Sequence, residues 1–184
     1  MTTQDTYLAE CFPEPPLIAY KRQRNIRDLL IKAKVFPIPR AYPKRQINGM
    51  KKCGRQCVIC SYIMEGNTIK TNQFSWKIKK NLNCLTHNIV YMIQCEKSNC
   101  KLRYIAESER KLQDRISEHI GYIRTKKLNK ATGEHFNLPG HSLADMKATI
   151  IEKVKKPETL YRKERERYHI NKFNTYHQGI NKKP

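Results

Sequence analysis

The sequence has few acidic side chains: 16 Asp and Glu residues stand against 37 Lys and Arg residues, which gives a formal net charge of +21. Folding a chain with so little negative charge brings like charges together, so a polyanionic partner is needed to relieve their repulsion. We therefore expect nucleic acid as the partner, contacted mainly through its phosphate backbone.

Long hydrophobic runs are also missing. No apolar stretch approaches the ~18 residues that a membrane span requires, so we do not expect an integral membrane protein. No segment combines a long apolar face with a basic one, so we expect no membrane partner either. Residues 1–10 lack the charged stretch and apolar core of a secretory signal. We expect an intracellular protein, in which the seven cysteines are metal ligands or buried thiols rather than disulfides.

The 184 residues predict one compact domain with a small module and an arm. Residues 1–52 are broken by prolines and predict a basic arm with one short helix at 25–34. Such an arm either binds the phosphate backbone of nucleic acid or is a solvated linker. The arm residues expected to bind nucleic acid are Lys21, Arg22, Arg24, Arg27, Lys44, Arg45, Lys51 and Lys52.

Residues 53–84 contain the first metal-ligand pattern, Cys53-x3-Cys57-x2-Cys60. A C-x2-C turn places two sulfurs on one side of a knuckle, as tetrahedral Zn²⁺ requires, and Cys84 is the nearest fourth donor. The segment has little apolar content, and a zinc site contributes on the order of 10 kcal/mol to folding. We therefore expect a cysteine-rich zinc module, with separate buried thiols as the alternative.

Residues 85–184 predict a mixed α/β (α+β) domain, with a short mixed or antiparallel sheet flanked by helices. Strands are expected at 88–95, 102–106 and about 148–154, the first two joined as a hairpin. Ser108 is expected to cap the first helix, which runs to about residue 126.

Two further features of this domain lie after the first helix. A polar turn containing Gly133, Pro139 and Gly140 is expected there, followed by the third strand. Pro157 is expected to begin a last helix that runs to about residue 173.

A second metal-ligand pattern joins the hairpin to the segment after the first helix. Cys95 and Cys100 bracket the hairpin turn, and His135 and His141 form an H-x5-H pair around a Pro-Gly turn. Together they would complete a Cys2His2 zinc site. Two solvated histidines are the alternative.

Six residues in chain order carry a family resemblance: Tyr91, Tyr104, Arg115, His119, Glu166 and Asn181. Two tyrosine triplets on a hairpin, an Arg/His helix, a glutamate on a later helix and a terminal asparagine resemble the GIY-YIG nuclease superfamily. The resemblance covers roughly residues 85–184 and implies the small GIY-YIG nuclease fold for them.

A closer resemblance is to the endonuclease of Penelope-like retroelements. It rests on Asn-Cys-Leu-Thr at 83–86, the cysteine pair inside the hairpin, H-F-N-x-x-G-H at 135–141 and the closing Gly-Ile-Asn at 179–181. Residues 12–20 and 27–30 resemble the segment that joins that family's reverse transcriptase to its nuclease. The resemblance implies a covalently linked reverse transcriptase and element RNA as a further partner; no polymerase-type Asp-Asp pair is present here.

The implied activity is metal-dependent nicking of target DNA in the nucleus, which exposes a 3′ hydroxyl for target-primed reverse transcription. In the implied mechanism Glu166 holds Mg²⁺ or Mn²⁺ and Tyr91 orients and deprotonates the attacking water. Arg115 stabilises the transition-state charge. The remaining roles are phosphate contact for Tyr104, proton transfer for His119 and support of the site for Asn181.

Ala106 departs from the family pattern, which has glycine at this position. If the position requires only close approach, activity survives in weakened form; if it requires a positive φ, activity is lost. The alternatives to an active retroelement nuclease are a catalytically lapsed nucleic-acid-binding zinc module of the same fold and a structure-selective repair nuclease.

Overall fold

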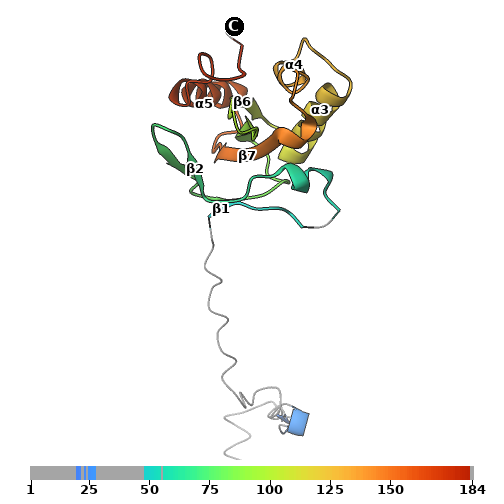
Figure 1. Ribbon diagram of the computed structural model, residues 1–184. Coiled ribbons are helices and arrows are strands. Elements are labelled where there is room, and N and C mark those ends of the chain that lie inside the picture. The colour runs from blue at the N-terminus through green and yellow to red at the C-terminus, as the bar shows by residue number, and fades with distance from the viewer. Residues whose placement is uncertain (1–19, 22, 24, 28–47, 55, 183–184) are drawn as a thin grey trace, which may run out of the picture. The chain divides into compact units, whose positions relative to one another are not determined.

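The computed structural model describes residues 20, 21, 23, 25–27, 48–54 and 56–182 (Figure 1). The chain divides into two compact units, Met1–Lys44 and Arg45–Pro184. In the first unit Ile26 and Arg27 are helical, and the rest of the helix expected at 25–34 lies outside the described residues. Four of the arm residues expected to bind nucleic acid also lie outside them: Arg22, Arg24, Lys44 and Arg45.

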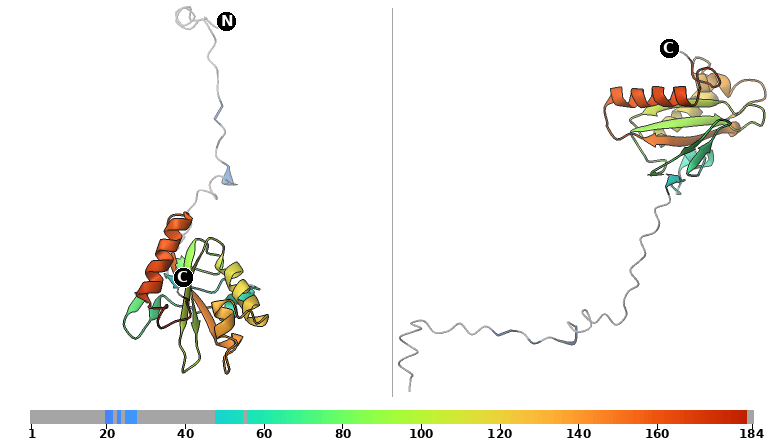
Figure 2. Two further views of the ribbon diagram at one scale, coloured as in Figure 1. Left: turned by 90° about the horizontal axis from the view of Figure 1, so that it is seen from above. Right: turned by 90° about the vertical axis from the view of Figure 1, so that its left-hand side faces the viewer.

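A three-stranded antiparallel sheet organises the second unit (Figure 2). Strand β5 (Ile89–Cys95) lies between β6 (Arg103–Ser108) and β7 (Met146–Lys153), and all seven of its residues are buried. Its β-branched and apolar sequence suits a strand covered on both faces. The predicted hairpin, third strand and mixed α/β class are confirmed.

Three helices flank this sheet: α3 (Leu112–Arg124), the short α4 (Ala131–His135) and α5 (Thr159–Lys172). Figure 2 shows α5 on one side of the sheet and α3 with α4 on the other. No helix in the described part of the chain is long and apolar enough to cross a membrane.

The prediction that Ser108 caps the first helix is wrong. Ser108 is the last residue of β6, where it is paired with Ile89, and its hydroxyl donates to the Arg110 carbonyl oxygen at 3.3 Å. The ladder to β5 extends the strand to this point, so α3 begins only at Leu112.

The prediction of a turn at Gly133 is also wrong, because this residue lies within α4. A Cβ atom at position 133 would approach the Lys127 carbonyl oxygen to 2.2 Å. Glycine is needed here for close backbone approach, not for a reversal of the chain. The 3₁₀ helix η2 (Leu143–Asp145) follows and leads into β7.

The cysteine-rich segment consists of short elements that surround one 3₁₀ helix, η1 (Val58–Tyr62). Strand β1 (Gly49–Met50) pairs in parallel with β4 (Asn81–Leu82), and β2 (Thr68–Lys70) pairs antiparallel with β3 (Ser75–Lys77). Residues 49–50, predicted as part of the arm, therefore pair within the second unit.

This segment is attached to β7 and α5 rather than forming a separate body. The Met64 amide donates to the Ala148 carbonyl at 2.9 Å, and the Trp76 indole N–H donates to the Ile151 carbonyl at 3.2 Å. Phe74 packs edge-on against Phe173, with ring centroids 5.0 Å apart. The cysteine-rich segment and the α/β domain thus share one hydrophobic core.

Arg162 fixes the start of α5 against β6. Its side chain is only 3% exposed, and its guanidinium contacts Glu107 at 2.9 Å and Glu109 at 3.1 Å. It also donates to Thr159 Oγ1 at 3.2 Å and to the Pro157 carbonyl. A buried cation with this many acceptors sets both the position and the rotation of the helix.

Replacing this cation tests its structural role. Arg162→Met keeps much of the apolar stem but leaves the Glu107 carboxylate without its buried partner, so we expect the free energy of unfolding to fall by about 3 kcal/mol. Urea denaturation measures this change. Arg167→Met, at an exposed position of the same helix, should change it by less than about 0.5 kcal/mol. Equal effects of the two substitutions would contradict the role assigned to Arg162.

Candidate active site and metal centres

A chain of three buried side chains runs from the central strand to α4. Tyr91 Oη lies 2.8 Å from Nε2 of His119, and His119 Nδ1 lies 2.8 Å from Oγ1 of Thr132. Tyr91 comes from β5, His119 from the inward face of α3, and all three residues are 2% exposed or less. The contact follows from the helical spacing of His119, because it shares the apolar stripe of Ile116, Ile120 and Ile123.

Two more tyrosines enclose the imidazole. The ring centroids of Tyr104 and Tyr122 lie 5.5 Å and 5.7 Å from that of His119. Beside them is a pocket of about 210 Å³, lined by Tyr104, Arg115, His119, Tyr122, Lys130, Ala131 and Thr132. Tyr91 does not line the pocket and reaches it through His119. The two cations at the rim make the pocket suitable for an anion.

Arg115 is held in place by a neighbouring carboxylate. It forms an ion pair with Glu118, whose other oxygen pairs with Arg110. Burial acts to lower the pKa of Arg115, but the nearby Tyr91 and Glu118 outweigh it and raise the pKa. The guanidinium therefore remains charged and fixed at the pocket wall.

Glu166 lies on α5, one helical turn after Arg162, and is not among the residues that line the pocket. Burial, and then the charge of Glu107, raise the pKa of Glu166. Arg115 counteracts this in part, and Glu166 in turn raises the pKa of Tyr91 and Tyr104. These mutual effects are long-range electrostatic ones, by which groups on α5, α3, β5 and β6 influence one another's protonation.

The protonation states differ from those expected for an ionised Tyr91. Burial raises the pKa of Tyr91 well above its usual value, the neighbouring Tyr104 adds to this, and Arg115 only partly opposes it. Burial, followed by Arg115, lowers the pKa of His119 to about 3. Neutral phenol and neutral imidazole therefore share the hydrogen bond, and Arg115 alone does not ionise Tyr91.

Asn181 supports the sheet edge rather than the pocket. Its Oδ1 accepts the Ile105 amide at 2.8 Å, and its Nδ2 donates to the Ile105 carbonyl at 2.7 Å. The side chain thus takes the place of a neighbouring strand along β6. It lies outside the group around the pocket in which it was predicted.

Ala106 is accommodated in regular strand geometry. It is 5% exposed and pairs directly with Tyr91 across the hairpin. It is not among the residues with positive φ. The backbone conformation that would have demanded glycine is therefore absent at this position, and the extra methyl group fits.

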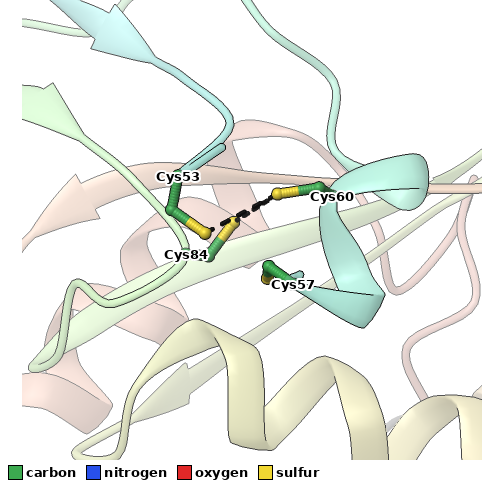
Figure 3. A group of neighbouring side chains, drawn as sticks. All are labelled: Cys53, Cys57, Cys60 and Cys84. Atoms are coloured by element: carbon green, nitrogen blue, oxygen red, sulfur yellow. Dashed lines mark hydrogen bonds between the residues drawn. The ribbon is translucent and has the colours of Figure 1, made fainter. Parts of the chain in front are cut away.

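Cys53, Cys57, Cys60 and Cys84 form the first of two metal-ligand groups (Figure 3). Their sulfurs all lie within 4.8 Å of one another, with 3.6 Å between Cys53 and Cys60 and 3.7 Å between Cys60 and Cys84. Although burial raises the pKa of Cys60, the Gly54 backbone amide and Cys53 lower it to about 7. Four thiols with one readily ionised member could hold a structural zinc ion.

Cys95, Cys100, His135 and His141 form the second group, and their donor atoms also lie within 4.8 Å of one another. Cys100 Sγ is 3.6 Å from His135 Nε2. Burial, and then His141, lower the pKa of His135, which keeps it neutral as a ligand must be.

The orientation of His141 supports a metal ligand more than a solvated side chain. Its Nδ1 is 3.4 Å from the Pro139 carbonyl, whereas its Nε2 is buried and has no hydrogen-bond partner. A proton on Nδ1 leaves the Nε2 lone pair available to a metal ion. The group could therefore hold a metal ion at that otherwise unsatisfied atom.

The structure also contains site residues that the sequence analysis missed. Tyr122 follows His119 by three positions, so helical spacing could have identified it. Thr132 and Lys130 gave no such signal, because the turn after α3 brings them to the pocket. Of the arm residues in the described region, Lys21, Arg27, Lys51 and Lys52 are exposed, and Lys52 pairs with Glu65 at 3.4 Å.

The two ligand groups predict about two zinc ions per chain in elemental analysis. Cys57→Ser and His141→Ala should each reduce the zinc content by about one, because each removes one of four donors. The matched control is His87→Ala, which changes an exposed histidine outside both groups and should keep both ions. Unchanged zinc content in His141→Ala would refute the Cys2His2 site.

The depressed pKa of His119 predicts an acid-sensitive fold. An unfolded histidine, with a pKa of about 6.5, binds a proton below that pH, whereas His119 in the folded state stays neutral down to about pH 3. Its contribution to stability is complete above pH 6.5 and declines as the pH falls. Between pH 6 and pH 5 the free energy of unfolding should decline by about 1 kcal/mol per pH unit more than in His119→Gln. Parallel pH curves from urea denaturation of the two proteins would contradict this.

In comparison with known proteins, the chain matches no protein-family model, no curated protein and no solved structure.

Proposed function

We propose that the chain is a metal-dependent DNA endonuclease of the GIY-YIG type, the C-terminal part of a Penelope-like retroelement. It nicks target DNA in the nucleus so that a linked reverse transcriptase can extend the 3′ end, with element RNA as the template. The observation that carries the proposal is the meeting of Tyr104, Arg115 and His119 at one pocket, with Tyr91 hydrogen-bonded behind His119. Glu166 on α5 adds a carboxylate that acts on Arg115 through its charge.

Glu166 is the residue suited to hold a catalytic Mg²⁺ or Mn²⁺. Its carboxylate is a hard oxygen ligand, and its raised pKa reflects burial beside a second carboxylate, that of Glu107. The protein's own cations compensate the negative charge of these two carboxylates only in part. A divalent cation would compensate the rest. When bound, such an ion supplies Lewis-acid stabilisation of the phosphate oxygens.

Arg115 and Lys130 hold the scissile phosphate. Both line the pocket, and the ion pair with Glu118 fixes Arg115 before substrate arrives. A preorganised guanidinium stabilises the extra negative charge of the transition state without costly reorganisation.

His119 and Tyr91 form a hydrogen-bonded pair that would orient the attacking water. Because the pKa of Tyr91 is raised and that of His119 is lowered to about 3, neither would hold the proton of that water at neutral pH, and the proton would leave to solvent. His119 lines the pocket and shares its Nε2 with the Tyr91 hydroxyl, while Thr132 fixes the other ring nitrogen. Both ring nitrogens are thereby engaged and the neutral imidazole is held in one orientation, with Tyr91 as its buried partner. Tyr104 lies against the same ring and contacts the phosphate or its water.

A catalytically lapsed nucleic-acid-binding module is the second candidate, favoured by one observation. Tyr91 is fully buried, and its pKa is raised rather than lowered. A protein that kept the fold, the two zinc groups and the net charge of +21 would bind DNA phosphates without cutting them.

Glu166→Gln separates the two candidates. Removing the carboxylate charge should reduce Mg²⁺-dependent nicking of supercoiled plasmid by at least about 100-fold, because the divalent ion loses its protein ligand. DNA binding, measured by fluorescence anisotropy, should change less than about two-fold. The control is Glu164→Gln, an exposed position of the same helix, which should nick at the native rate. Full activity of Glu166→Gln would remove this residue from the mechanism, and a native protein inactive with both Mg²⁺ and Mn²⁺ would establish the lapsed binder.

A further inference from the structure

A second pocket, of about 360 Å³, lies where β3, β4, β7 and α5 meet. Its lining differs from that of the candidate active site and shares no residue with it. Arg165 faces this pocket, whereas the next residue, Glu166, interacts with Arg115 and Tyr91. Arg165, but not Glu166, lines this second pocket, and neither residue lines the candidate active-site pocket.

Positive charge surrounds this second pocket. Six cations line it: Lys77, Lys79, Lys80, Lys153, Lys155 and Arg165. The only carboxylate in the lining is Glu152, which contacts Arg165 at 2.7 Å and His169 at 2.7 Å. Among the ion pairs of the described residues, none involves the five lysines. Their charge is thus left for an external anion.

The remaining wall is apolar. Ile78, Leu82 and Ile151 are each 2% exposed or less, and Trp76 is partly exposed beside them. The indole is held rigidly: its N–H donates to Ile151, Lys172 Nζ lies 5.3 Å from the ring centre, and the His169 ring packs against it at 4.9 Å. A fixed aromatic side chain loses little conformational entropy when a ligand stacks on it.

We propose that this pocket binds single-stranded nucleic acid, with an unpaired base against the apolar wall and the flanking phosphates on the lysines. Aromatic side chains in a positively charged groove are the usual means of binding single strands without sequence preference. Duplex DNA suits the pocket less well, because its bases are stacked inside and cannot reach the apolar wall. DNA and RNA strands share the recognised chemistry, a base with a phosphodiester backbone.

The single tryptophan of the chain provides a direct readout, because Trp76 lies in the pocket. The test titrates the native protein, without Mg²⁺, with a 12-nucleotide oligothymidylate and, separately, with oligouridylate. We expect saturable quenching of Trp76 fluorescence by at least one of them, and the comparison shows which sugar is preferred. A blunt duplex and polyglutamate should quench far less. Quenching by the duplex or by polyglutamate equal to that by the single strands would overturn the proposal. Binding of a single strand without any change in Trp76 fluorescence would overturn it as well.

A double variant, Lys79→Gln with Lys155→Gln, tests whether the lysines of this pocket bind the phosphates. Both side chains are exposed, so the substitutions should leave the unfolding midpoint unchanged. The affinity for oligothymidylate should fall about ten-fold, and the slope of log K against log salt should decrease by about 1.4, at 0.7 per lost phosphate contact. The control is Arg124→Gln with Lys126→Gln, which removes two exposed cations near the end of α3 and should keep the native affinity. Native affinity in the Lys79/Lys155 variant would refute the site.

This site does not depend on the proposed nuclease activity. Addition of oligothymidylate should quench the Trp76 fluorescence of the Glu166→Gln variant as it does in the native protein, even though the nicking activity of this variant is expected to be lost. Quenching by a protein that never nicks would leave the strand-binding site standing and remove only the nuclease. Nicking activity without fluorescence quenching would support the nuclease and remove the strand-binding site.

Discussion

The position of one buried guanidinium determines whether the candidate active site can form. Arg162 ties α5 to the carboxylates that end β6, and Glu166 lies one turn further along the same helix. A rotation of α5 by one residue position would turn Glu166 away from Arg115 and bring a neighbouring side chain into its place. The site thus depends on an ion pair outside the pocket, whose members need no contact with substrate.

The first metal-ligand group lies in a segment with little regular secondary structure. The cysteine-rich segment contains strands of two and three residues, too short to hold a fold by pairing alone. Its attachments to β7 through Met64 and Trp76 add to the core but leave the loops around Cys53 and Cys57 to be fixed by the ligand group. Coordination would supply the stability that side-chain packing cannot provide there.

Much of the fold and of the metal-ligand groups could be predicted from the sequence, because these features depend on local chemistry. Buried strands such as β5 follow from runs of β-branched residues, and the cysteine spacing indicated which thiols would meet. The errors arose where tertiary contacts override local preference. Ser108 is a good helix cap by type, yet pairing with Ile89 keeps it in a strand. Gly133 looks like a turn residue, yet a carbonyl oxygen beside it demands glycine inside a helix. The sequence analysis did not single out Arg162, because nothing local distinguishes one arginine of α5 from its neighbours.

The placement of the second ligand group has a consequence for how the protein would respond to metal starvation. His135 ends α4, the same five-residue helix that carries Thr132, and Thr132 is hydrogen-bonded to Nδ1 of His119. A helix this short has almost no stability of its own, so its register relies on what holds its last residue. If the Cys95, Cys100, His135 and His141 group held a zinc ion, a chelator that removed it would therefore also loosen the imidazole of His119. Returning zinc, rather than adding magnesium, would then restore the arrangement.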